Sequence, residues 1–223
     1  MPPAFHPGEP GEGRISEGHH HRRGQHGARN RNAPRRRGAR RPGDRSGSEE
    51  AKRLAEELGG STTGAGPDAA ITGDVVVLAL YYPSIKDAVR EYGDRLARKT
   101  VVETTNPVDT STWDRLATPA DTSATEELAE LVPAGTPVVK AFNTTFANTL
   151  VAGEAAGQQL DVLIAGDDQA KAKVKGLAES GGLRPIDVGG LERARQLEHV
   201  GLLHITLQEP LGAGYQSALK LHW

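Results

Sequence analysis

The stretch DVVVLAL at Asp74–Leu80 decides the fold class. It is a continuous apolar run of strand length, which is typical of a parallel strand covered on both faces. Further runs of strand length follow along the chain: TVVET at 100–104, PVVKA at 137–141, DVLIA at 161–165 and RPIDV at 184–188. Segments with helical periodicity separate these runs. The alternation predicts βαβ units and an α/β fold with a doubly wound, mostly parallel sheet.

The helical segments follow from apolar spacing and from residues that begin or end a helix. They cover residues 49–58, 84–96, 123–132, 144–150, 168–179 and 191–208. We expect Asp168 near the N-cap of its helix and a short edge strand at Ser61–Gly64. The last helix is the longest, and its predicted apolar side is formed by Leu197, Val200, Leu203, His204 and Leu207.

Charge divides the chain into two segments. Residues 1–48 contain 11 Arg and 4 acidic residues, a net charge of +7, so the remainder of a chain with a total of −2 carries −9. The first segment is rich in Arg, Pro and Gly, and it has too few large apolar side chains to offset its ordering entropy. We therefore expect residues 1–48 to be disordered and residues 49–223 to form the folded domain.

Missing residue types exclude several functions. The chain has no cysteine, which excludes disulfide bonds, cysteine-ligated zinc and thiol nucleophiles. No run approaches the ~18 apolar residues of a membrane-spanning helix, and the N-terminus lacks the apolar region of a secretory signal. These features predict a cytoplasmic protein without membrane association.

Polar and aromatic residues follow three of the predicted strands. They are Tyr81-Tyr82-Pro83, Thr105-Asn106-Pro107 and Phe142-Asn143-Thr144. Ligands of open α/β sheets bind outside the carboxyl ends of the strands, so these loops are candidate binding sites. Asn side chains can both donate to and accept from a cofactor. Asn-Pro is also common in ordinary turns, so spacing alone leaves both interpretations open.

Several segments together resemble a known family. They are DVVVLALYYPSI at 74–85, VVETTNPVD at 101–109, VVKAFNTTFA at 138–147, VLIAGDD at 162–168 and LRPIDVGGLERARQLE at 183–198. In this order they resemble the NADPH-dependent reductases of the deazaflavin coenzyme (factor 420) and related NADP-binding reductase domains. The resemblance covers residues 49–223. It implies a Rossmann-like fold and an oxidoreductase that transfers a hydride between NADP(H) and the deazaflavin coenzyme.

The resemblance also implies site residues. The loop Leu80-Tyr81-Tyr82-Pro83 would pass the NADP pyrophosphate and ribose, and Thr105-Asn106-Pro107 would lie near the nicotinamide ribose. The segment Lys140-Ala141-Phe142-Asn143 would flank the nicotinamide, and Ala141 and Phe142 would form the wall for the second redox ring. Direct hydride transfer needs no catalytic acid or base, because the cofactors carry the chemistry and the protein supplies position. A homodimer is also implied.

The glycine loop of a Rossmann fold is missing from its expected place. The first strand, a G-x-G-x-x-G turn and a helix should precede the segment at 49–58, but residues 18–46 contain no apolar strand and no spaced glycine triplet. Codon degeneracy permits a glycine loop in a shifted frame, so we hypothesise that residues up to about Ser46 come from a displaced reading frame. The first βα unit is then missing or degraded, and we expect an exposed sheet edge and weak or absent NADP binding.

Other features have simpler interpretations. His204 could approach a substrate, although a satisfied core or interface position is the commoner role of such a histidine. Neither Gly166-Asp167-Asp168 nor His19-His20-His21 predicts a structured metal site. The Arg-rich segment suggests nucleic-acid binding, which the acidic remainder and the lack of interleaved aromatics disfavour. The main alternative to the enzyme is a non-catalytic nucleotide-binding or scaffold relic of the same family.

Overall fold

A computed structural model describes residues 45–223, with side chains from Ser48 onward. Internal contacts divide the chain after Gly38, and the described residues all lie in the second unit, Ala39–Trp223. The expected disorder of residues 1–48 and the displaced reading frame therefore fall almost entirely outside the described residues. Helix α1 spans Arg45–Leu58, so it begins before the predicted start at Glu49.

A central sheet organises the described part of the chain. Within residues 45–223 it has five strands in the order β1-β2-β3-β6-β7. They are β1 (Val75–Leu78), β2 (Thr100–Glu103), β3 (Val138–Lys140), β6 (Asp161–Gly166) and β7 (Arg184–Gly189). Neighbours are parallel except β3 and β6, which are antiparallel. The predicted α/β fold with a mostly parallel, Rossmann-like sheet is thus confirmed.

The strands pair in a register that aligns the ends of β1, β2 and β3. Leu78 lies opposite Glu103, and Glu103 lies opposite Lys140. All three strands run in the same direction, so the loops that follow them leave the sheet at one rim. This confirms that the three predicted loops share one edge of the sheet.

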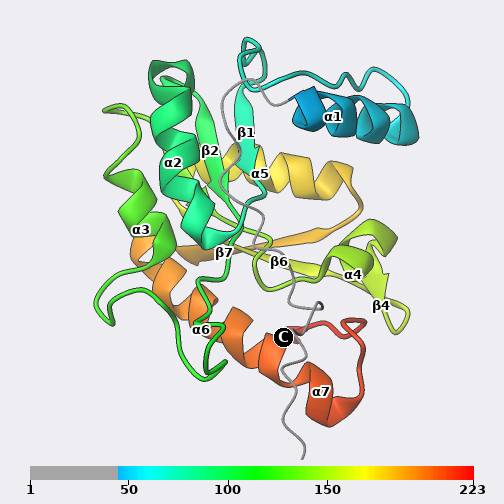
Figure 1. Cartoon of the computed structure of the whole chain (residues 1–223). Coiled ribbons are helices and arrows are strands. Elements are labelled where there is room, and N and C mark those ends of the chain that lie inside the picture. Colours follow the sequence, from blue (N-terminus) through cyan, green and yellow to red (C-terminus); the bar gives the residue numbers. More distant parts are fainter. Residues whose placement is uncertain (1–44) are drawn as a thin grey trace, which may run out of the picture. The chain divides into compact units, whose positions relative to one another are not determined.

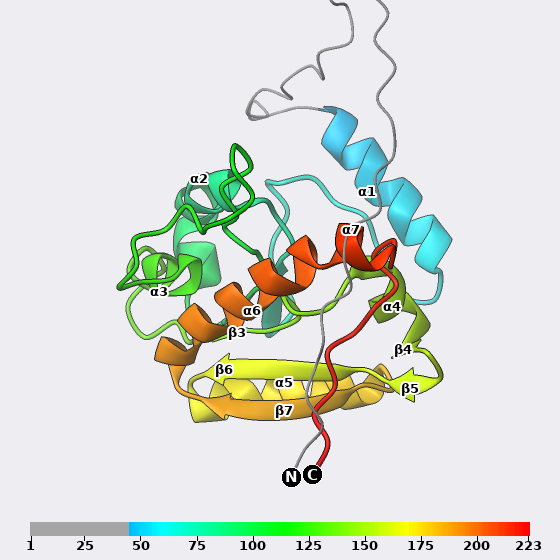
Figure 2. The ribbon, with the colours of Figure 1, turned by 90° about the horizontal axis from the view of Figure 1, so that it is seen from below.

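Helices cover both faces of the sheet, as the name doubly wound requires. The principal helices are α2 (Tyr82–Tyr92), α3 (Ala124–Ala129), α5 (Asp168–Ser180) and α6 (Ala194–Thr206). Figure 1 shows α5 and α6 on opposite sides of β6 and β7, and the turned view in Figure 2 agrees. Shorter elements are 3-10 turns at Gly93–Leu96 and Leu191–Arg193, α4 (Ala147–Ala152), α7 (Gln208–Leu211) and a small hairpin of β4 (Glu154–Ala155) and β5 (Gln158–Gln159).

The alternation of side chains along β2 and β3 builds two apolar clusters. Val101 and Val138 pack with Ile85 and Val89 of α2 and Leu128 of α3. The next residue on each strand points to the other face, where Val102 and Val139 pack in a second cluster whose α5 members are Ala170, Val174 and Ala178. These continuous β-branched runs are buried on both faces, which explains why they lack a polar alternation.

Strand β1 is the edge of the sheet and is less covered than its neighbours. Every residue of β2 and β3 is buried, whereas Val77 of β1 is 45% exposed. On α1, Leu54 and Leu58 are 55% and 65% exposed. The expected open edge with partly uncovered apolar side chains is therefore present among the described residues.

One local prediction was wrong, and another was confirmed. Residues Ser61–Gly64 form no strand, and a Cβ on Gly64 would overlap the α1 backbone at Ala51 and Lys52, so this segment packs on a helix instead of a sheet. The N-cap of α5 is Asp167, whose carboxylate accepts from Gln169 N and Ala170 N. Asp168 is the first helical residue and so lies next to the N-cap, as predicted.

The predicted helix at 191–208 is divided, and its buried side differs from the prediction. A 3-10 turn precedes α6, and α7 follows it. Leu203 is 58% exposed, whereas Glu198 and Gly201 are buried with Leu197 and His204. The prediction used the spacing of apolar residues, so it could not assign a charged residue or a glycine to the buried side. No helix among residues 45–223 is long and apolar enough to cross a membrane.

Candidate functional site

The candidate site lies at the rim where β1, β2 and β3 end. The first loop leads directly into α2, with Tyr81 at the N-cap and Pro83 in the first turn. Leu80 and Tyr81 are 39% and 87% exposed, so this loop presents apolar and aromatic surface to solvent. A side chain of the rim also joins two strands, since Thr104 Oγ1 donates to Leu78 O over 3.3 Å.

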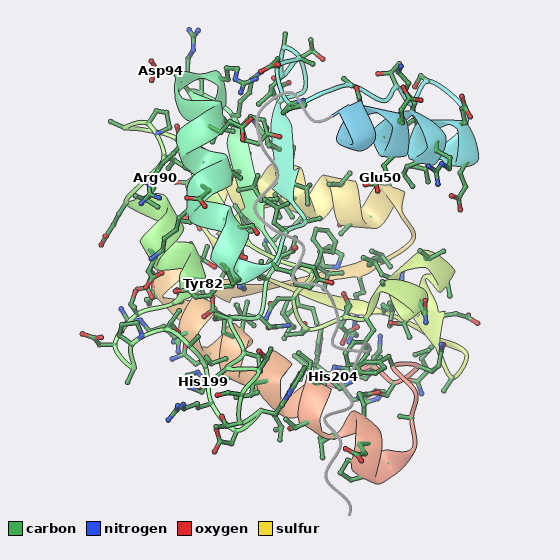
Figure 3. All side chains as sticks on the ribbon, in the orientation of Figure 1. Glu50, Tyr82, Arg90, Asp94, His199 and His204 are labelled. Carbon is green, nitrogen blue, oxygen red and sulfur yellow. The ribbon has the colours of Figure 1, made fainter. Side chains whose placement is uncertain are left out.

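Tyr82 points toward α3. Its hydroxyl donates to Glu127 Oε2 over 2.7 Å, and Lys86 lies 2.9 Å from the same oxygen. Burial, together with the hydrogen bond to Glu127, raises the pKa of Tyr82 well above its usual range. Figure 3 shows Tyr82 at the first turn of α2. Its visible role is to fasten α2 to α3.

The second and third loops are joined by a reciprocal pair of Asn side chains. Asn106 Nδ2 donates to Asn143 O over 2.7 Å, and Asn143 Nδ2 donates to Asn106 Oδ1 over 2.9 Å. Asn143 Nδ2 also donates to Leu197 O of α6 over 2.8 Å. The structure thus brings together two residues predicted from separate loops and anchors them to a helix that no strand-end rule would include.

Gly201 of α6 makes room for this pair. A Cβ at position 201 would lie 2.7 Å from Asn106 Cγ and 2.9 Å from its Nδ2, closer than such atoms can approach. Glycine is otherwise unfavourable inside a helix. Its presence in α6 is explained by the close packing of the Asn106 amide.

Asn143 Oδ1 is a buried acceptor without a partner among the described residues. The residue is only 5% exposed. Buried acceptors are nearly always hydrogen-bonded in proteins, so an unpaired one is an indication of a ligand or water that completes it. The Thr105 hydroxyl, on the adjacent loop, is also buried without a hydrogen-bond partner among the described residues.

Phe142 has a strained backbone. Its φ is 65°, in the left-handed region that few residues other than Gly, Asn and Asp adopt. The conformation is held by Thr145, whose backbone N and Oγ1 donate to Phe142 O over 3.3 and 2.9 Å. Strain of this kind clusters at ligand sites, where the surrounding structure compensates for its cost.

Lys140 does not present its ammonium to the rim. It is fully buried, and its Nζ contacts Glu103, Glu198 and the Thr105 carbonyl. Ala141 is also fully buried, and its N donates to Glu103 O over 3.2 Å. Pro107 is buried as well, and its carbonyl accepts from Ala117 N over 2.6 Å. These three predicted residues shape the loops from below instead of lining open surface.

His204 occupies a satisfied core position. It is 4% exposed, with Nδ1 3.2 Å from Thr144 O and Nε2 2.9 Å from Ser217 Oγ. A carbonyl only accepts, so Nδ1 carries the proton and Nε2 accepts from the hydroxyl. Burial lowers the pKa of His204 and favours this neutral form. Its ring centroid lies 4.4 Å from that of Phe146, and Figure 3 shows it on α6.

Sequence reasoning missed Glu103, Glu198, Leu197 and Gly201. A signal existed for the first, because an acidic residue ends the buried run VVE while a basic residue ends the neighbouring run VVK. Opposite charges at matched positions of adjacent strands predict a pair. Glu198 and Gly201 are far away in the sequence, and only the packing of α6 reveals their part.

Two hollows among the described residues lie away from the rim. One of about 390 Å³ lies between α1 and the segment Gly59–Gly64, and another of about 380 Å³ lies between the β4–β5 hairpin and the C-terminal tail at 216–222. Neither is lined by any predicted site residue.

The architecture places the chain in the class of Rossmann-like α/β domains, and comparisons refine this class. A family profile described as NADP oxidoreductase, coenzyme F420-dependent, matches residues 42–107. A solved structure of a putative F420-dependent NADP-reductase from Arthrobacter sp. FB24 is 32% identical, with a TM-score of 0.64, and the match covers 70% of this chain and 72% of that one. The chain belongs to the family of F420-dependent NADP oxidoreductases.

Curated relatives match over part of their length. The F420-dependent NADP reductase of Methanocaldococcus jannaschii is 34% identical over 145 residues, which are 63% of this chain and 64% of that protein. The metalloreductase STEAP3 of Rattus norvegicus is 34% identical over 134 residues, 60% of this chain and 26% of that protein. The chain thus spans just under two thirds of the length of the M. jannaschii reductase and about a quarter of the length of STEAP3. The family is described as one of NADP oxidoreductases.

Proposed function

We propose that the chain transfers a hydride between NADP(H) and a deazaflavin coenzyme of the factor 420 type, with the nicotinamide lying at the rim of β2 and β3. The observation that carries the proposal is the unpaired Asn143 Oδ1, a buried acceptor held between two strand ends and α6. A nicotinamide carboxamide and a ribose hydroxyl both carry the donor that this atom lacks. The residues at this end of the site therefore fit the cofactor.

The proposed roles of the loops follow their placement. Leu80, Tyr81, Tyr82 and Pro83 form the side along which the dinucleotide extends, and Thr105 and Asn106 lie beside the ribose next to the nicotinamide, with Pro107 buried beneath them. Phe142 forms the wall for the second ring, while the buried Lys140 and Ala141 support the loops from below. When bound, NADPH supplies the hydride from its nicotinamide ring. The residues orient the two rings and exclude water between them, which is sufficient for direct transfer.

The pyrophosphate end fits less well. Among residues 45–223, the spacing G-x-G-x-x-A occurs at Gly64–Ala69, but no strand precedes it and no helix follows it. A pyrophosphate needs the free backbone N–H groups of a glycine turn at a helix N-terminus. We therefore propose that the described domain binds the dinucleotide weakly and mainly through its nicotinamide end.

A two-part experiment tests the function. Reduced deazaflavin coenzyme and NADP⁺ are mixed with the purified chain without oxygen, and formation of NADPH is followed by absorbance. We expect enzyme-dependent formation that falls at least about tenfold in Asn143→Ala, because a transition-state contact worth about 1.4 kcal/mol changes the rate tenfold. The matched control is Asn148→Ala, which changes an exposed Asn in α4. No transfer by the unmodified chain would refute the proposal.

Titration of NADPH by fluorescence tests the affinity separately. We expect a dissociation constant above the low-micromolar range, and a tighter one contradicts the argument from the glycine turn.

The homodimer implied by the resemblance stays a prediction, which sedimentation of the full chain checks.

A further inference from the structure

Three charged side chains are completely buried beneath the rim. Glu103 ends β2, Lys140 ends β3 and Glu198 lies on α6, and each has an exposed fraction of 0%. Lys140 Nζ donates to Glu103 Oε2 over 2.5 Å, to Thr105 O over 2.6 Å and to Glu198 Oε1 over 3.0 Å. An ammonium has three N–H donors, so every donor of Lys140 is used.

The carboxylate oxygens are also occupied. Glu103 Oε1 accepts from Thr105 N over 2.5 Å, and its Oε2 accepts from Thr125 Oγ1 over 2.7 Å. Glu198 Oε2 accepts from Ala124 N over 3.2 Å. Burial raises the pKa of Glu198, as expected where two carboxylates share one cation. The network therefore links β2, β3, α3 and α6 without an exposed atom.

Such a network is a poor device for stability alone. Removing charges from water is costly, and buried ion pairs can often be replaced by apolar residues of similar volume without loss of stability. This favours a role of the network in fixing geometry. The elements that it joins are those that carry the Asn106–Asn143 pair.

Each member of the network lies next to a contact of that pair. Thr105, held through both its N and its O, immediately precedes Asn106. Glu198 immediately follows Leu197, whose carbonyl accepts from Asn143 Nδ2. Lys140 is the last residue of β3, and Asn143 lies three residues further along, in the loop that follows this strand. The network thus sets the separation of the two loops and the position of the α6 carbonyl.

We propose that Glu103, Lys140 and Glu198 are positioning residues, which hold the Asn106–Asn143 pair so that Asn143 Oδ1 faces the nicotinamide end of the cofactor. This inference rests on the proposed function. The residues touch no reacting atom. They act through the amide pair, and their loss lets the nicotinamide take more than one orientation.

The test uses a variant that removes all three charges together. Glu103→Gln, Lys140→Met and Glu198→Gln combined keep the side-chain sizes and leave amide oxygens for Thr105 N and Ala124 N. The matched control is Lys171→Met. Lys171 is another buried lysine, 3% exposed, which donates to Asp187 over 2.8 Å. It lies at the opposite end of the sheet, because β6 and β7 run antiparallel to β3.

Two measurements report on position and not on the amount of folded protein. The first is hydrogen exchange of the Asn143 side-chain amide by nuclear magnetic resonance, with the signal assigned by its loss in Asn143→Asp. The second is the facial fidelity of hydride transfer, measured with NADPH deuterated on one or the other face. A smaller folded fraction leaves this ratio unchanged.

In the triple variant we expect the amide protons to exchange at least about tenfold faster, which corresponds to about 1.4 kcal/mol, and hydride transfer from one face to become transfer from both. Lys171→Met should leave both measurements unchanged. A folded triple variant with unchanged exchange and fidelity overturns the inference, as does an equal change in the control. If the triple variant does not fold, Glu198→Gln alone is judged by the same criteria. If the unmodified chain transfers no hydride, the proposed function fails, and the exchange measurement decides the positioning role alone.

Discussion

Gly201→Ala offers a sharp test of how α6 and the rim are packed. In most helix interiors this substitution is favourable, by about 0.8–1.0 kcal/mol. At position 201 the added methyl group would lie 2.7 Å from Asn106 Cγ. The Asn106 amide is not free to swing aside, because hydrogen bonds to Asn143 hold both its nitrogen and its oxygen.

The expected change is the difference between these effects. Displacing the Asn106 amide breaks two hydrogen bonds and leaves their Asn143 partners buried without water, at a cost of about 1–1.5 kcal/mol for each. Subtracting the gain in helix propensity leaves a net loss of about 1–2 kcal/mol in the free energy of unfolding. The sign is therefore opposite to that of an ordinary glycine in a helix.

Urea unfolding followed by circular dichroism measures this change. Gly176→Ala in α5 is the control, because nothing lies within 4 Å of a Cβ at that position, and it should increase stability by about 0.8–1.0 kcal/mol. In an Asn106→Ala background the obstacle is gone, so Gly201→Ala should become stabilising by a similar amount. If Gly201→Ala stabilises the unmodified chain as much as Gly176→Ala does, the close packing of Asn106 against α6 is refuted.

Three further predictions concern other parts of the domain. Burial alone would raise the pKa of Asp161, but hydrogen bonds from Arg184 and Lys220 lower it well below its usual range. Its contribution to stability is therefore complete above about pH 4 and is lost as the pH falls further. In unfolding experiments, Asp161→Asn should be less stable at neutral pH, and its unfolding free energy should fall less steeply toward acid pH. An unchanged dependence on pH would contradict this. Burial lowers the pKa of His204, so stability should fall as the pH drops below about 6.5; His204→Gln should reduce this slope in the same assay, and an identical slope would exclude the assignment. Val77→Lys places a charge on the open edge strand, and light scattering should show less self-association with a change in unfolding free energy below about 0.5 kcal/mol; equal scattering would show that the edge does not drive association.

The sequence was sufficient to predict the layers of the fold. Runs such as DVVVLAL, TVVET and PVVKA are apolar at consecutive positions, and the structure buries β2 and β3 on both faces. Parallel direction then follows from the intervening helices, and with it the meeting of three loops at one rim. The antiparallel β6 was not predicted, because an apolar run carries no information about its direction. Only the connection through α4 and the small hairpin decides it.

The candidate site could be predicted in part. Asn106 and Asn143 were predicted because each lies in a loop that follows a strand, and the structure brings the two side chains together. Spacing could not predict that Tyr81 is exposed and Lys140 is buried. Both residues lie at the end of an apolar run, so the pattern around them is alike. Lys140 is buried only because Glu103 and Glu198 accept its hydrogen bonds, and Glu198 is far away along the chain on a helix whose buried side was assigned to apolar residues.

Folding and ligand binding depend on different parts of this sheet. The apolar core is centred on β2, β3 and β6, which have a neighbour on each side and cover on both faces, so the described domain has the contacts that a stable core requires. β1 has a single neighbour and an exposed Val77, yet it leads into the loop along which the dinucleotide is proposed to extend. A stable fold is therefore compatible with weak affinity for the cofactor. We expect the buried network under β2 and β3 to hold the proposed nicotinamide end of the site independently of the edge strand.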